Sequence, residues 1–302
     1  MLEIKNVYKT FNPGTVNQKV ALNDLNLTLE DGDFVTVIGG NGAGKSTMLN
    51  AIAGVFQVDS GTITIDGQDV TKLPEHKRAA FLGRVFQDPM MGTAPTMQIE
   101  ENLALAARRG QPRGLKWGIT ALERADYREL LKTLDLGLED RLTAKVGLLS
   151  GGQRQALTLL MASLKQPKLL LLDEATSGLD PVVRDELIDL LLDFVRDEDH
   201  AILISSHIVS DLEKLCDTIA FLHKGKLLLC EDKDTLREEY ALWHGTAGQL
   251  EELDKNAIVS RRVTAYGAEA LVKRELVPAG STLTPVSIEE LFVLMVKGEN
   301  VR

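Results

Sequence analysis

The chain is poor in cysteine, in aromatic residues and in long apolar runs. Its 302 residues include two cysteines, Cys216 and Cys230. Their separation does not fit a metal site, so we expect both to be reduced core residues of a cytosolic protein. No stretch approaches the ~20 apolar residues that a membrane-spanning helix needs. The segment from Met1 to Lys5 lacks the apolar core of a signal peptide. We therefore expect neither a signal peptide nor a transmembrane segment.

Positive charge is also in short supply. Lys and Arg number 34 against 44 Asp and Glu, which gives a formal net charge of −10. Because nucleic-acid-binding surfaces are basic, this balance argues against nucleic acid as a main partner. The share of hydrophobic residues, 44%, is typical of a globular protein. The length suits one large domain, or a core domain with an appendage.

The most informative stretch is a glycine-rich loop between an apolar run at 34–38 and a helix-compatible run at 48–53. It matches G-x-x-x-x-G-K-S in the strand–loop–helix context of a phosphate loop. Glycines let backbone N–H groups turn toward an anion, and the following helix adds its positive end. Lys45 is expected on the β- and γ-phosphates and the Ser46 hydroxyl on Mg²⁺. A plain glycine-rich turn is the alternative. The candidate nucleotide contacts are Gly39, Asn41, Gly42, Ala43, Gly44, Lys45, Ser46 and Thr47.

Residues 1 to about 38 are predicted to be β-structure, because apolar residues alternate there before a turn at 31–32. Phe11 is a candidate for stacking on an adenine ring. Tyr8 competes for this role, and a core or turn phenylalanine is the alternative. Residues 61–69 are predicted to form a hairpin around Asp66-Gly67.

A short strand is predicted at 81–86, and Gln87 follows it before Asp88-Pro89. A polar side chain at the carboxyl end of a strand lies where α/β sheets place ligands. A loop glutamine that bonds to the backbone is the alternative. From about residue 95 to 165 the spacing of apolar residues becomes helical, for example over 99–107 and 127–134.

A second candidate anion site begins at Ser150. Ser150 and Gln153 fit a capping box at a helix start. Gly151 and Gly152, however, weaken a first helical turn relative to alanine. They make sense if bare N–H groups approach an anion closely. One nucleotide hardly needs two such helix starts from one subunit.

Polar residues follow two further predicted core strands. Asp173 and Glu174 come directly after four leucines, where an Asp can hold Mg²⁺ through water and a Glu can deprotonate an attacking water. Solvated loop carboxylates are the alternative. Asp180 precedes Pro181 and suits a helix N-cap, which alone could explain it. His207 follows the strand at 201–204 and could meet the γ-phosphate or be a turn residue.

Taken in order along the chain, these motifs resemble those of the ATP-binding-cassette (ABC) ATPases over residues 1 to about 230. The resemblance implies an α/β fold with a P-loop NTPase core of the ABC ATPase type, an antiparallel β-subdomain, a helical subdomain and a small C-terminal appendage. It implies ATP binding and Mg²⁺-dependent hydrolysis. Transmembrane subunits are then separate chains, and the protein lies at the cytoplasmic face of the membrane.

The resemblance also assigns roles. Phe11 matches the adenine-stacking aromatic, although tyrosine is commoner there. Gln87 matches the glutamine that senses Mg²⁺ and couples to the membrane subunit, Asp173 the Mg²⁺ aspartate and Glu174 the catalytic glutamate. Residues 150–153 match the signature, which closes over ATP held by the other subunit of a head-to-tail dimer, with an identical or a related partner. Asp180 matches a dimer-contacting aspartate and His207 the switch histidine.

The subfamily resemblance is divided. Residues 88 to about 165 look like amino-acid-type, tryptophan-related uptake ATPases, whereas 175–240 and the tail at 288–298 look like ABC-2-type exporter ATPases. A mosaic sequence would explain this division. We expect an ABC ATPase domain at 1–230, with the helical subdomain at about 87–165, and an appendage at 231–302. The stretches 259–264, 268–274 and 287–296 are expected to form a small strand–helix appendage that covers the core, regulates or dimerises.

Two other functions fit parts of the pattern. A soluble ABC ATPase of DNA repair or translation would carry long coiled coils or two cassettes, whereas this chain has one cassette and no sustained heptads. A regulatory module could hold ATP without hydrolysing it, but Glu174 and His207 are both present. A hydrolysing transporter subunit is the favoured interpretation.

Overall fold

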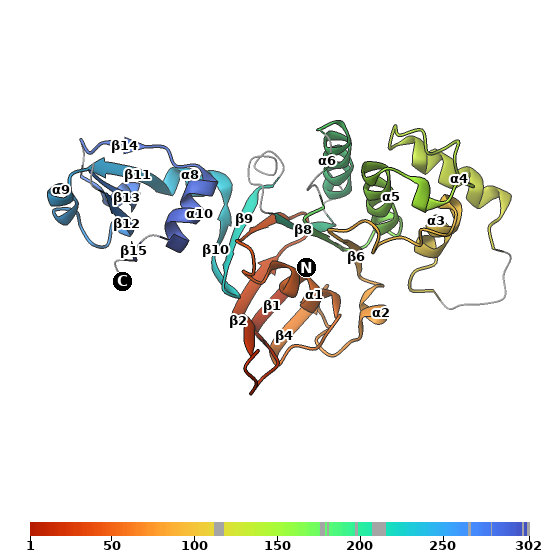
Figure 1. Ribbon diagram of the computed structural model, residues 1–302, viewed down its shortest axis with the longest axis horizontal. Coiled ribbons are helices and arrows are strands. Elements are labelled where there is room, and N and C mark those ends of the chain that lie inside the picture. Colours follow the sequence, from red (N-terminus) through yellow and green to blue (C-terminus); the bar gives the residue numbers. More distant parts are fainter. Residues whose placement is uncertain are drawn as a thin grey trace.

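Three β-sheets organise the fold (Figure 1). The computed structural model describes residues 1–111, 118–175, 179, 181–196, 199–206, 216–264, 267–278, 280–297 and 299–300. The helical subdomain and the C-terminal appendage lie at opposite edges of the central sheet, the helical subdomain towards β6 and the appendage beside β9 and β10 (Figure 1). The α/β cassette fold with a parallel core sheet, antiparallel sheets and a C-terminal subdomain is thereby confirmed.

The central sheet has the order β10-β9-β3-β8-β7-β6. All its pairings are parallel except that of β10, which runs antiparallel to β9 at one edge. The apolar runs predicted as core strands form β3, β7 and β8, in which every residue is buried. The strands are β3 (Phe34–Ile38), β6 (Leu82–Val85), β7 (Leu169–Asp173), β8 (Ala201–Ser206), β9 (Thr218–His223) and β10 (Lys226–Asp232).

The two faces of this sheet belong to different hydrophobic clusters. In β3, Val35 and Val37 pack with α1 (Lys45–Ala53) and the antiparallel sheet, whereas Phe34 and Ile38 pack with the helices of the other face. Successive strand residues point to opposite faces, so both faces need apolar side chains. The helix that follows the glycine-rich loop is therefore enclosed between two sheets.

The antiparallel sheet has the order β2-β1-β4-β5. Its strands are β1 (Leu2–Phe11), β2 (Lys19–Leu29), β4 (Ser60–Ile65) and β5 (Gln68–Asp69). The predicted hairpin at 61–69 is confirmed, with β4 paired to β5. Asp66 and Gly67 have φ values of 51° and 72°. Positive φ at both central residues is the requirement of the tight turn that suits twisted strands.

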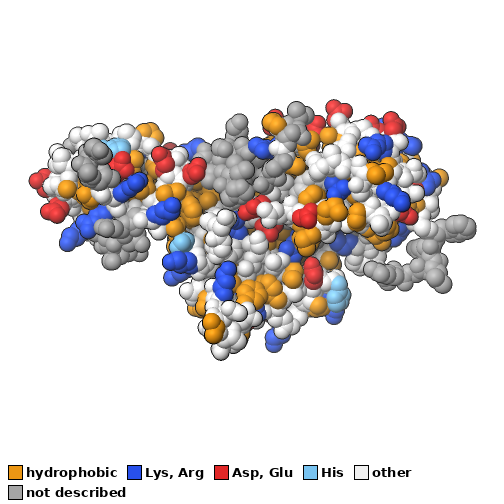
Figure 2. Space-filling view, in the orientation of Figure 1, with side chains coloured by type: hydrophobic (Ala, Val, Ile, Leu, Met, Phe, Trp, Pro, Cys, Tyr) orange, Lys and Arg blue, Asp and Glu red, His pale blue; other side chains and the backbone are white. Residues whose placement is uncertain are grey.

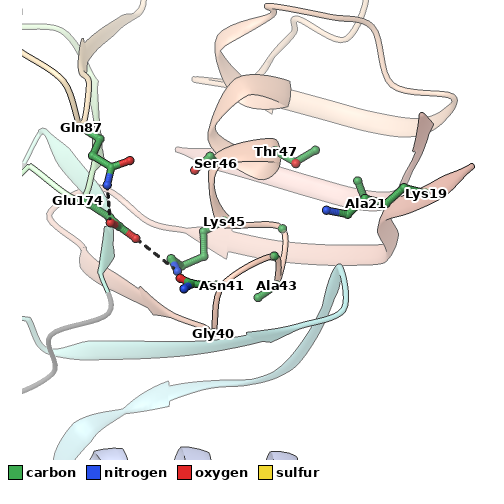
Figure 3. A pocket seen from close by; sticks show the side chains of 12 residues that line it. Lys19, Ala21, Gly40, Asn41, Ala43, Lys45, Ser46, Thr47, Gln87 and Glu174 are labelled. Carbon is green, nitrogen blue, oxygen red and sulfur yellow. Dashed lines mark hydrogen bonds and ion pairs between the residues drawn. The ribbon is translucent and has the colours of Figure 1, made fainter. Parts of the chain in front are cut away.

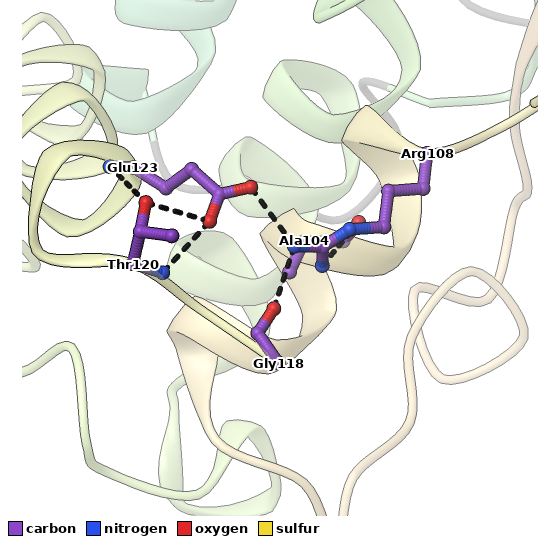
Figure 4. A network of polar contacts seen from close by, with 5 residues as sticks. All are labelled: Ala104, Arg108, Gly118, Thr120 and Glu123. Atoms are coloured by element: carbon purple, nitrogen blue, oxygen red, sulfur yellow. Dashed lines mark hydrogen bonds and ion pairs between the residues drawn. The ribbon is translucent and has the colours of Figure 1, made fainter. Parts of the chain in front are cut away.

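The helical subdomain contains α3 (Ile99–Ala107), α4 (Ala121–Lys132), the 3-10 turn η1 (Val146–Leu148) and α5 (Gly151–Ser163). The helix expected over 127–134 begins earlier, at Ala121, because Thr120 and Glu123 form a capping box there. Arg108 braces this start: its Nη2 donates to Gly118 O at 2.6 Å and lies 2.8 Å from Glu123 Oε1 (Figure 4). Two further helices are α2 (Glu75–Arg78) and α6 (Pro181–Arg196).

The C-terminal appendage has its own sheet, in the order β14-β11-β13-β12-β15. The stretches 259–264, 268–274 and 287–296, expected to form a strand–helix appendage, are present as β12, β13 and α10, with no end shifted by more than one residue. Phe292 of α10 packs edge-on against Phe221 of β9, with ring centroids 5.2 Å apart. The remaining elements were not expected. The bounds are α8 (Lys233–Glu239), β11 (Tyr240–Gly245), α9 (Ala247–Glu251), β12 (Ile258–Thr264), β13 (Gly267–Lys273), η2 (Arg274–Leu276), β14 (Leu283–Thr284), α10 (Ile288–Lys297) and β15 (Glu299–Asn300).

The surface mixes both signs of charge. On the face shown in Figure 2, acidic and basic side chains are interspersed over the described parts of the molecule. Within those parts, no helix is both long enough and apolar enough to cross a membrane. Cys216 is buried, Cys230 is partly buried, and both are free thiols. Burial raises the pKa of the Cys230 thiol to about 11, so this thiol stays protonated at neutral pH.

Candidate nucleotide site

A cavity of about 250 Å³ lies over the start of α1, between the glycine-rich loop and the carboxyl ends of the central strands (Figure 3). Gln87 and Glu174 lie at one end of this cavity, and Lys19 and Ala21 at the other (Figure 3). The lining residues are Lys19, Ala21, Gly40, Asn41, Gly42, Ala43, Gly44, Lys45, Ser46, Thr47, Gln87 and Glu174.

The start of α1 presents backbone N–H groups to this cavity. The N-cap residue, Gly44, has φ 112° and supplies no side chain to cap the helix. The N–H groups of the first helical turn have no intrahelical partner, and no side chain of Gly44 competes for them. A Cβ atom on Gly44 would lie 2.7 Å from the Ala21 carbonyl oxygen, so no larger residue fits. Uncapped N–H groups at the positive end of a helix form a site for an anion.

Lys45 points into the cavity and already has partners. Its side chain is 6% exposed, and its Nζ donates to the Gly39 carbonyl oxygen at 2.7 Å. The same Nζ lies 3.5 Å from Glu174 Oε1 (Figure 3). A buried ammonium group needs such compensation. A phosphate that binds Lys45 would therefore replace one or both of these contacts.

Glu174 contacts Gln87 and Lys45, two other residues that the sequence predicts for the site. Its Oε2 accepts a hydrogen bond from Gln87 Nε2 at 2.9 Å, while Oε1 faces Lys45 (Figure 3). Glu174 has φ 46°, and its N–H donates to the carbonyl oxygen of Ser205 at 3.0 Å. The left-handed region is costly for a residue other than glycine, and such backbone strain is often found at turns and at functional sites. This turn at the end of β7 places the carboxylate at the cavity.

Asp173 does not line the cavity itself, and its carboxylate accepts hydrogen bonds from two serine hydroxyl groups. Its Oδ1 accepts hydrogen bonds from Ser46 Oγ at 3.2 Å and from Ser205 Oγ at 2.7 Å. A hydroxyl and a carboxylate are hard oxygen ligands, as Mg²⁺ prefers. Among the described residues, no group of three or more His, Cys, Asp and Glu side chains could hold a metal alone. Such a sparse set suits Mg²⁺, which takes its other ligands from water and substrate phosphates.

Arg84 supports the site from β6. Its Nη2 donates to Asn50 Oδ1 on α1, and its guanidinium lies 4.3 Å from the Phe86 ring centroid. Burial lowers the pKa of Arg84, while the charges of Glu75 and Asp173 act in the opposite direction. A guanidinium stays charged in proteins, so Arg84 ties β6 to α1 as a cation.

The second glycine pair begins α5 as expected, with Ser150 as N-cap. Ser150 Oγ accepts from the Gln153 N–H at 3.2 Å, and Gln153 Oε1 accepts from the Ser150 N–H at 3.2 Å. The space next to the Cα of Gly151 is open, whereas a Cβ on Gly152 would lie 3.1 Å from Val183. None of residues 150–153 lines the cavity over α1. The structure therefore does not bring the two candidate anion sites together within one chain.

Phe11 lies at the end of β1, next to the cavity but not among its lining residues. Its ring packs edge-on against Phe56 at 5.3 Å, and Lys9 Nζ lies 5.7 Å from its centroid. Its partner across the β1–β2 ladder is Lys19, which does line the cavity. Lys19 and Ala21 were not identified from the sequence. The alternation of β2 contains them but does not show which face meets the loop.

Two sequence candidates cannot be placed. Asp180 and His207 lie outside the described residues, as do Ser177 and Gly178. The described site therefore joins the glycine-rich loop, Gln87, Asp173 and Glu174. It offers a cation, uncapped N–H groups, hard oxygen ligands and a carboxylate at one cavity. These groups suit binding of a nucleoside polyphosphate and attack of water on it.

Comparison with known proteins gives the family. A protein-family model described as "ABC transporter" matches residues 22–177. The "Tyrosine transport ATP-binding protein" of Clostridioides difficile (strain R20291) is 42% identical over 235 residues, which cover 78% of this chain and 93% of that protein. The "ABC transporter ATP-binding protein YtrB" of Bacillus subtilis (strain 168) is 30% identical over 311 residues, which cover 99% of each chain.

A solved structure matches the cassette as well. It is the dimeric structure of a post-hydrolysis state of the ATP-binding cassette MJ0796 bound to ADP and Pi. It aligns with a TM-score of 0.68 and 28% identity, covering 77% of this chain and 98% of that chain. Family match, relatives and fold agree with the geometry of the cavity. The chain belongs to the ABC transporter family, as an ATP-binding subunit that hydrolyses ATP to energise a transporter.

Proposed function

We propose that the cavity over α1 binds Mg²⁺-ATP and that Glu174 is the general base for its hydrolysis. The observation that carries this proposal is the position of the Glu174 carboxylate, between Lys45 Nζ and Gln87 Nε2 at the cavity end. A base must lie within reach of the water that it activates, and that water must lie near the γ-phosphate. Because Lys45 Nζ lies 3.5 Å from Glu174 Oε1, a phosphate that binds Lys45 lies near Glu174.

The roles of the chain's own groups follow from their contacts. The N–H groups of the first α1 turn and Lys45 bind the β- and γ-phosphates. As Lys45 exchanges Glu174 for phosphate, the carboxylate is released to accept a proton from the attacking water. Gln87 holds Glu174 Oε2 and orients it. Ser46 and Asp173 would hold Mg²⁺, whose chemistry is to neutralise charge on the β- and γ-phosphate oxygens. We assign Asp180 and His207 the roles implied by the family resemblance.

Replacing the base tests the proposal. Glu174→Gln should keep ATP affinity but lower turnover by ~10²–10⁴, the range for loss of a positioned base. Glu129→Gln makes the same chemical change in an exposed ion pair with Lys132 on α4, and it should leave turnover unaltered. ATP affinity by titration and phosphate release are measured on the same preparations. Near-normal phosphate release from Glu174→Gln would remove Glu174 from the mechanism.

The second anion site supports a head-to-tail dimer, with an identical or a related partner. Residues 150–153 do not line the cavity of their own chain, so the open helix start at Gly151 suits ATP held by a partner. The MJ0796 cassette was solved as a dimer with ADP and Pi. ATP should therefore drive association, most visibly in Glu174→Gln. Sedimentation with and without Mg²⁺-ATP tests this association. If two Glu174→Gln subunits do not associate with each other in Mg²⁺-ATP even when the membrane subunits are present, the proposal is contradicted.

The remaining partners are the transmembrane subunits, which would hold the protein at the cytoplasmic face of the membrane. The 42% identity to a tyrosine transport protein supports an amino acid as the transported substrate. Purification of the membrane subunits with this chain, followed by uptake of labelled amino acids into vesicles, tests both points. If the vesicles take up neither tyrosine nor any other labelled amino acid, this substrate class is excluded.

The domain division at about residue 230 is also a proposal. The appendage, 231–302, has its own sheet and its own hydrophobic cluster, which includes Trp243, Leu250 and Val272. The Phe292–Phe221 contact supports a role in covering the core sheet beside β9. If covering is its main role, Phe292→Ala should lower stability and leave nucleotide affinity unchanged at a temperature where the protein stays folded. Altered affinity under those conditions would favour regulation instead.

A further inference from the structure

Lys19 is a second cation in the cavity, at the end opposite Glu174. It lies in β2, two residues before Ala21, so both side chains point to the same face of the strand. Both line the cavity together with residues 40–47 (Figure 3). The Lys19 side chain reaches from β2 toward the glycine-rich loop (Figure 3). A Cβ on Gly42 would lie 4.0 Å from Lys19 Nζ, which places the ammonium within reach of an anion on this loop.

The strand that carries Lys19 is fixed against the loop. The Ala21 carbonyl oxygen lies where a Cβ on Gly44 would be only 2.7 Å away, so the two backbones are in close contact. The neighbouring Asn23 N–H donates to the Gly225 carbonyl oxygen at 2.9 Å, and the Gly225 N–H donates to the Ala43 carbonyl oxygen at 2.7 Å. The distance between β2 and the loop is therefore set by backbone contacts. Lys19 therefore reaches the cavity from a strand whose position is fixed, and not from a loop.

The two cations of the cavity differ in their partners. Lys45 donates to Gly39 O and pairs with Glu174, so binding a phosphate costs it existing contacts. Among the described residues, no carboxylate forms an ion pair with Lys19. Within the described parts of the chain, a phosphate that meets Lys19 would therefore displace no side-chain partner. The net gain from such a contact is not reduced by loss of a protein partner.

The order of groups along the cavity indicates which phosphate Lys19 meets. Lys45 and Glu174 mark the γ end of the bound triphosphate under the proposed function. Lys19 lies at the far end, and its partner across the β1–β2 ladder is Phe11, the candidate adenine contact. Between the β-phosphate and the base, ATP carries the α-phosphate and the ribose, and of these only the α-phosphate is an anion that an ammonium group would bind. Resting on the proposed function, we propose that Lys19 binds the α-phosphate of the nucleotide.

This contact predicts an unusual selectivity. ATP and ADP share the α-phosphate, so Lys19→Ala should weaken the affinity for both by the same factor, about five- to tenfold for one well-placed charged contact. Lys45→Ala removes the cation at the β- and γ-phosphates and should weaken ATP more than ADP. At about 1 M salt, where the Debye length is about 3 Å, the loss in Lys19→Ala should shrink.

The experiment measures ATP and ADP affinity by titration without hydrolysis, in Glu174→Gln protein and at two salt concentrations. The variants are Lys19→Ala, Lys19→Arg, Lys45→Ala and Lys77→Ala. Lys77→Ala removes an equal charge from the exposed surface of α2 and should alter neither affinity. Lys19→Arg keeps the charge and should recover most of the loss. Thermal unfolding without nucleotide shows whether Lys19→Ala affects the fold.

The outcomes separate the two proposals. An equal, salt-sensitive loss for ATP and ADP supports Lys19 as the α-phosphate contact. If Lys19→Ala loses affinity for ATP alone, or loses no affinity, this assignment is wrong. If Lys45→Ala binds nucleotide more weakly in the same experiment, the proposed nucleotide site still stands. If Lys19→Ala and Lys45→Ala both bind normally, the nucleotide does not occupy this cavity, and the proposed function itself fails.

Discussion

Arg78 is a buried charge at the C-terminal end of α1. Its side chain is 1% exposed. Its guanidinium donates to the carbonyl oxygens of Ala51 at 2.7 Å, Ile52 at 2.8 Å, Thr71 at 2.9 Å and Leu73 at 2.8 Å. A cation at a helix C-terminus also interacts favourably with the helix dipole. One side chain thereby fixes α1 to the segment that leads into α2.

Arg78→Met keeps an unbranched side chain and removes all of these donors. Each buried carbonyl group that loses its partner costs ~1–3 kcal/mol. The Ala51 carbonyl keeps the Gly54 N–H at 3.2 Å, and the variant no longer has to desolvate a guanidinium. With these offsets, we expect the free energy of unfolding to fall by ~3–5 kcal/mol, the lower part of the range for the other three carbonyl groups at ~1–3 kcal/mol each. A typical total is only ~5–15 kcal/mol.

Urea unfolding followed by circular dichroism measures this loss. Lys77→Met makes a similar substitution at the exposed neighbouring position and should change stability by less than ~0.5 kcal/mol, as surface substitutions usually do. Arg78→Lys should recover only part of the loss, because an ammonium group lacks the planar fork that meets several carbonyls at once. A loss below ~1 kcal/mol in Arg78→Met, within the ordinary range for any substitution, would refute the reasoning.

Three further predictions concern the nucleotide, the dimer and pH. Phe11→Ala should lose ~1–3 kcal/mol of nucleotide affinity if Phe11 stacks on adenine; a loss in Tyr8→Ala alone would transfer the role. Gly151→Asp should bind ATP in titrations but sediment as a monomer, because its carboxylate repels the partner's phosphates; an ATP-driven dimer would contradict this. Hydrogen bonds from Arg124, opposed by desolvation, hold the pKa of Glu100 below its ordinary 4.5. Stability from this pair exists above about pH 4.5 and is lost as the pH falls through the lowered pKa. The stability difference between wild type and Glu100→Gln in urea should therefore shrink in that range; a constant difference would disprove it.

The residues at the carboxyl edge of the central sheet could be predicted because their positions depend on one rule. Gln87 and Glu174 are 87 residues apart in sequence, and Ser46 and Asp173 are 127 apart, yet each pair is in contact. Gln87, Asp173 and Glu174 lie at or just after the carboxyl ends of strands of the central sheet, and Ser46 lies at the start of the helix that follows β3 and the glycine-rich loop. The carboxyl ends of parallel strands meet at one edge of the sheet. Apolar runs predict where the strands lie, and the polar residues that end or follow each run are then predicted to lie at the carboxyl edge of the sheet.

Other features depend on information that a single strand pattern does not contain. Lys19 lies in an alternating strand, and alternation shows that two faces exist but not which one meets the loop. The strands β14 and β15 have two residues each, too few for any period. The early start of α4 was readable, since Thr120 and Glu123 have the capping-box spacing. The packing of Phe11 on Phe56 depends on a contact across 45 residues.

Backbone contacts fix the glycine-rich loop, whereas under the proposed function its side chains would exchange partners when a phosphate binds. A Cβ on Gly225 would lie 2.4 Å from the Ala21 carbonyl oxygen, and Gly225 has φ 76°. The hairpin between β9 and β10 can therefore lie directly against β2, and its N–H supports the loop at Ala43. Donors fixed in this way need little reorganisation when a phosphate arrives. Lys45 and Glu174 can then separate during the reaction without loss of the cradle. Because β10 continues from this hairpin into residues 231–302, a continuous run of backbone connects the appendage to the turn that supports the glycine-rich loop.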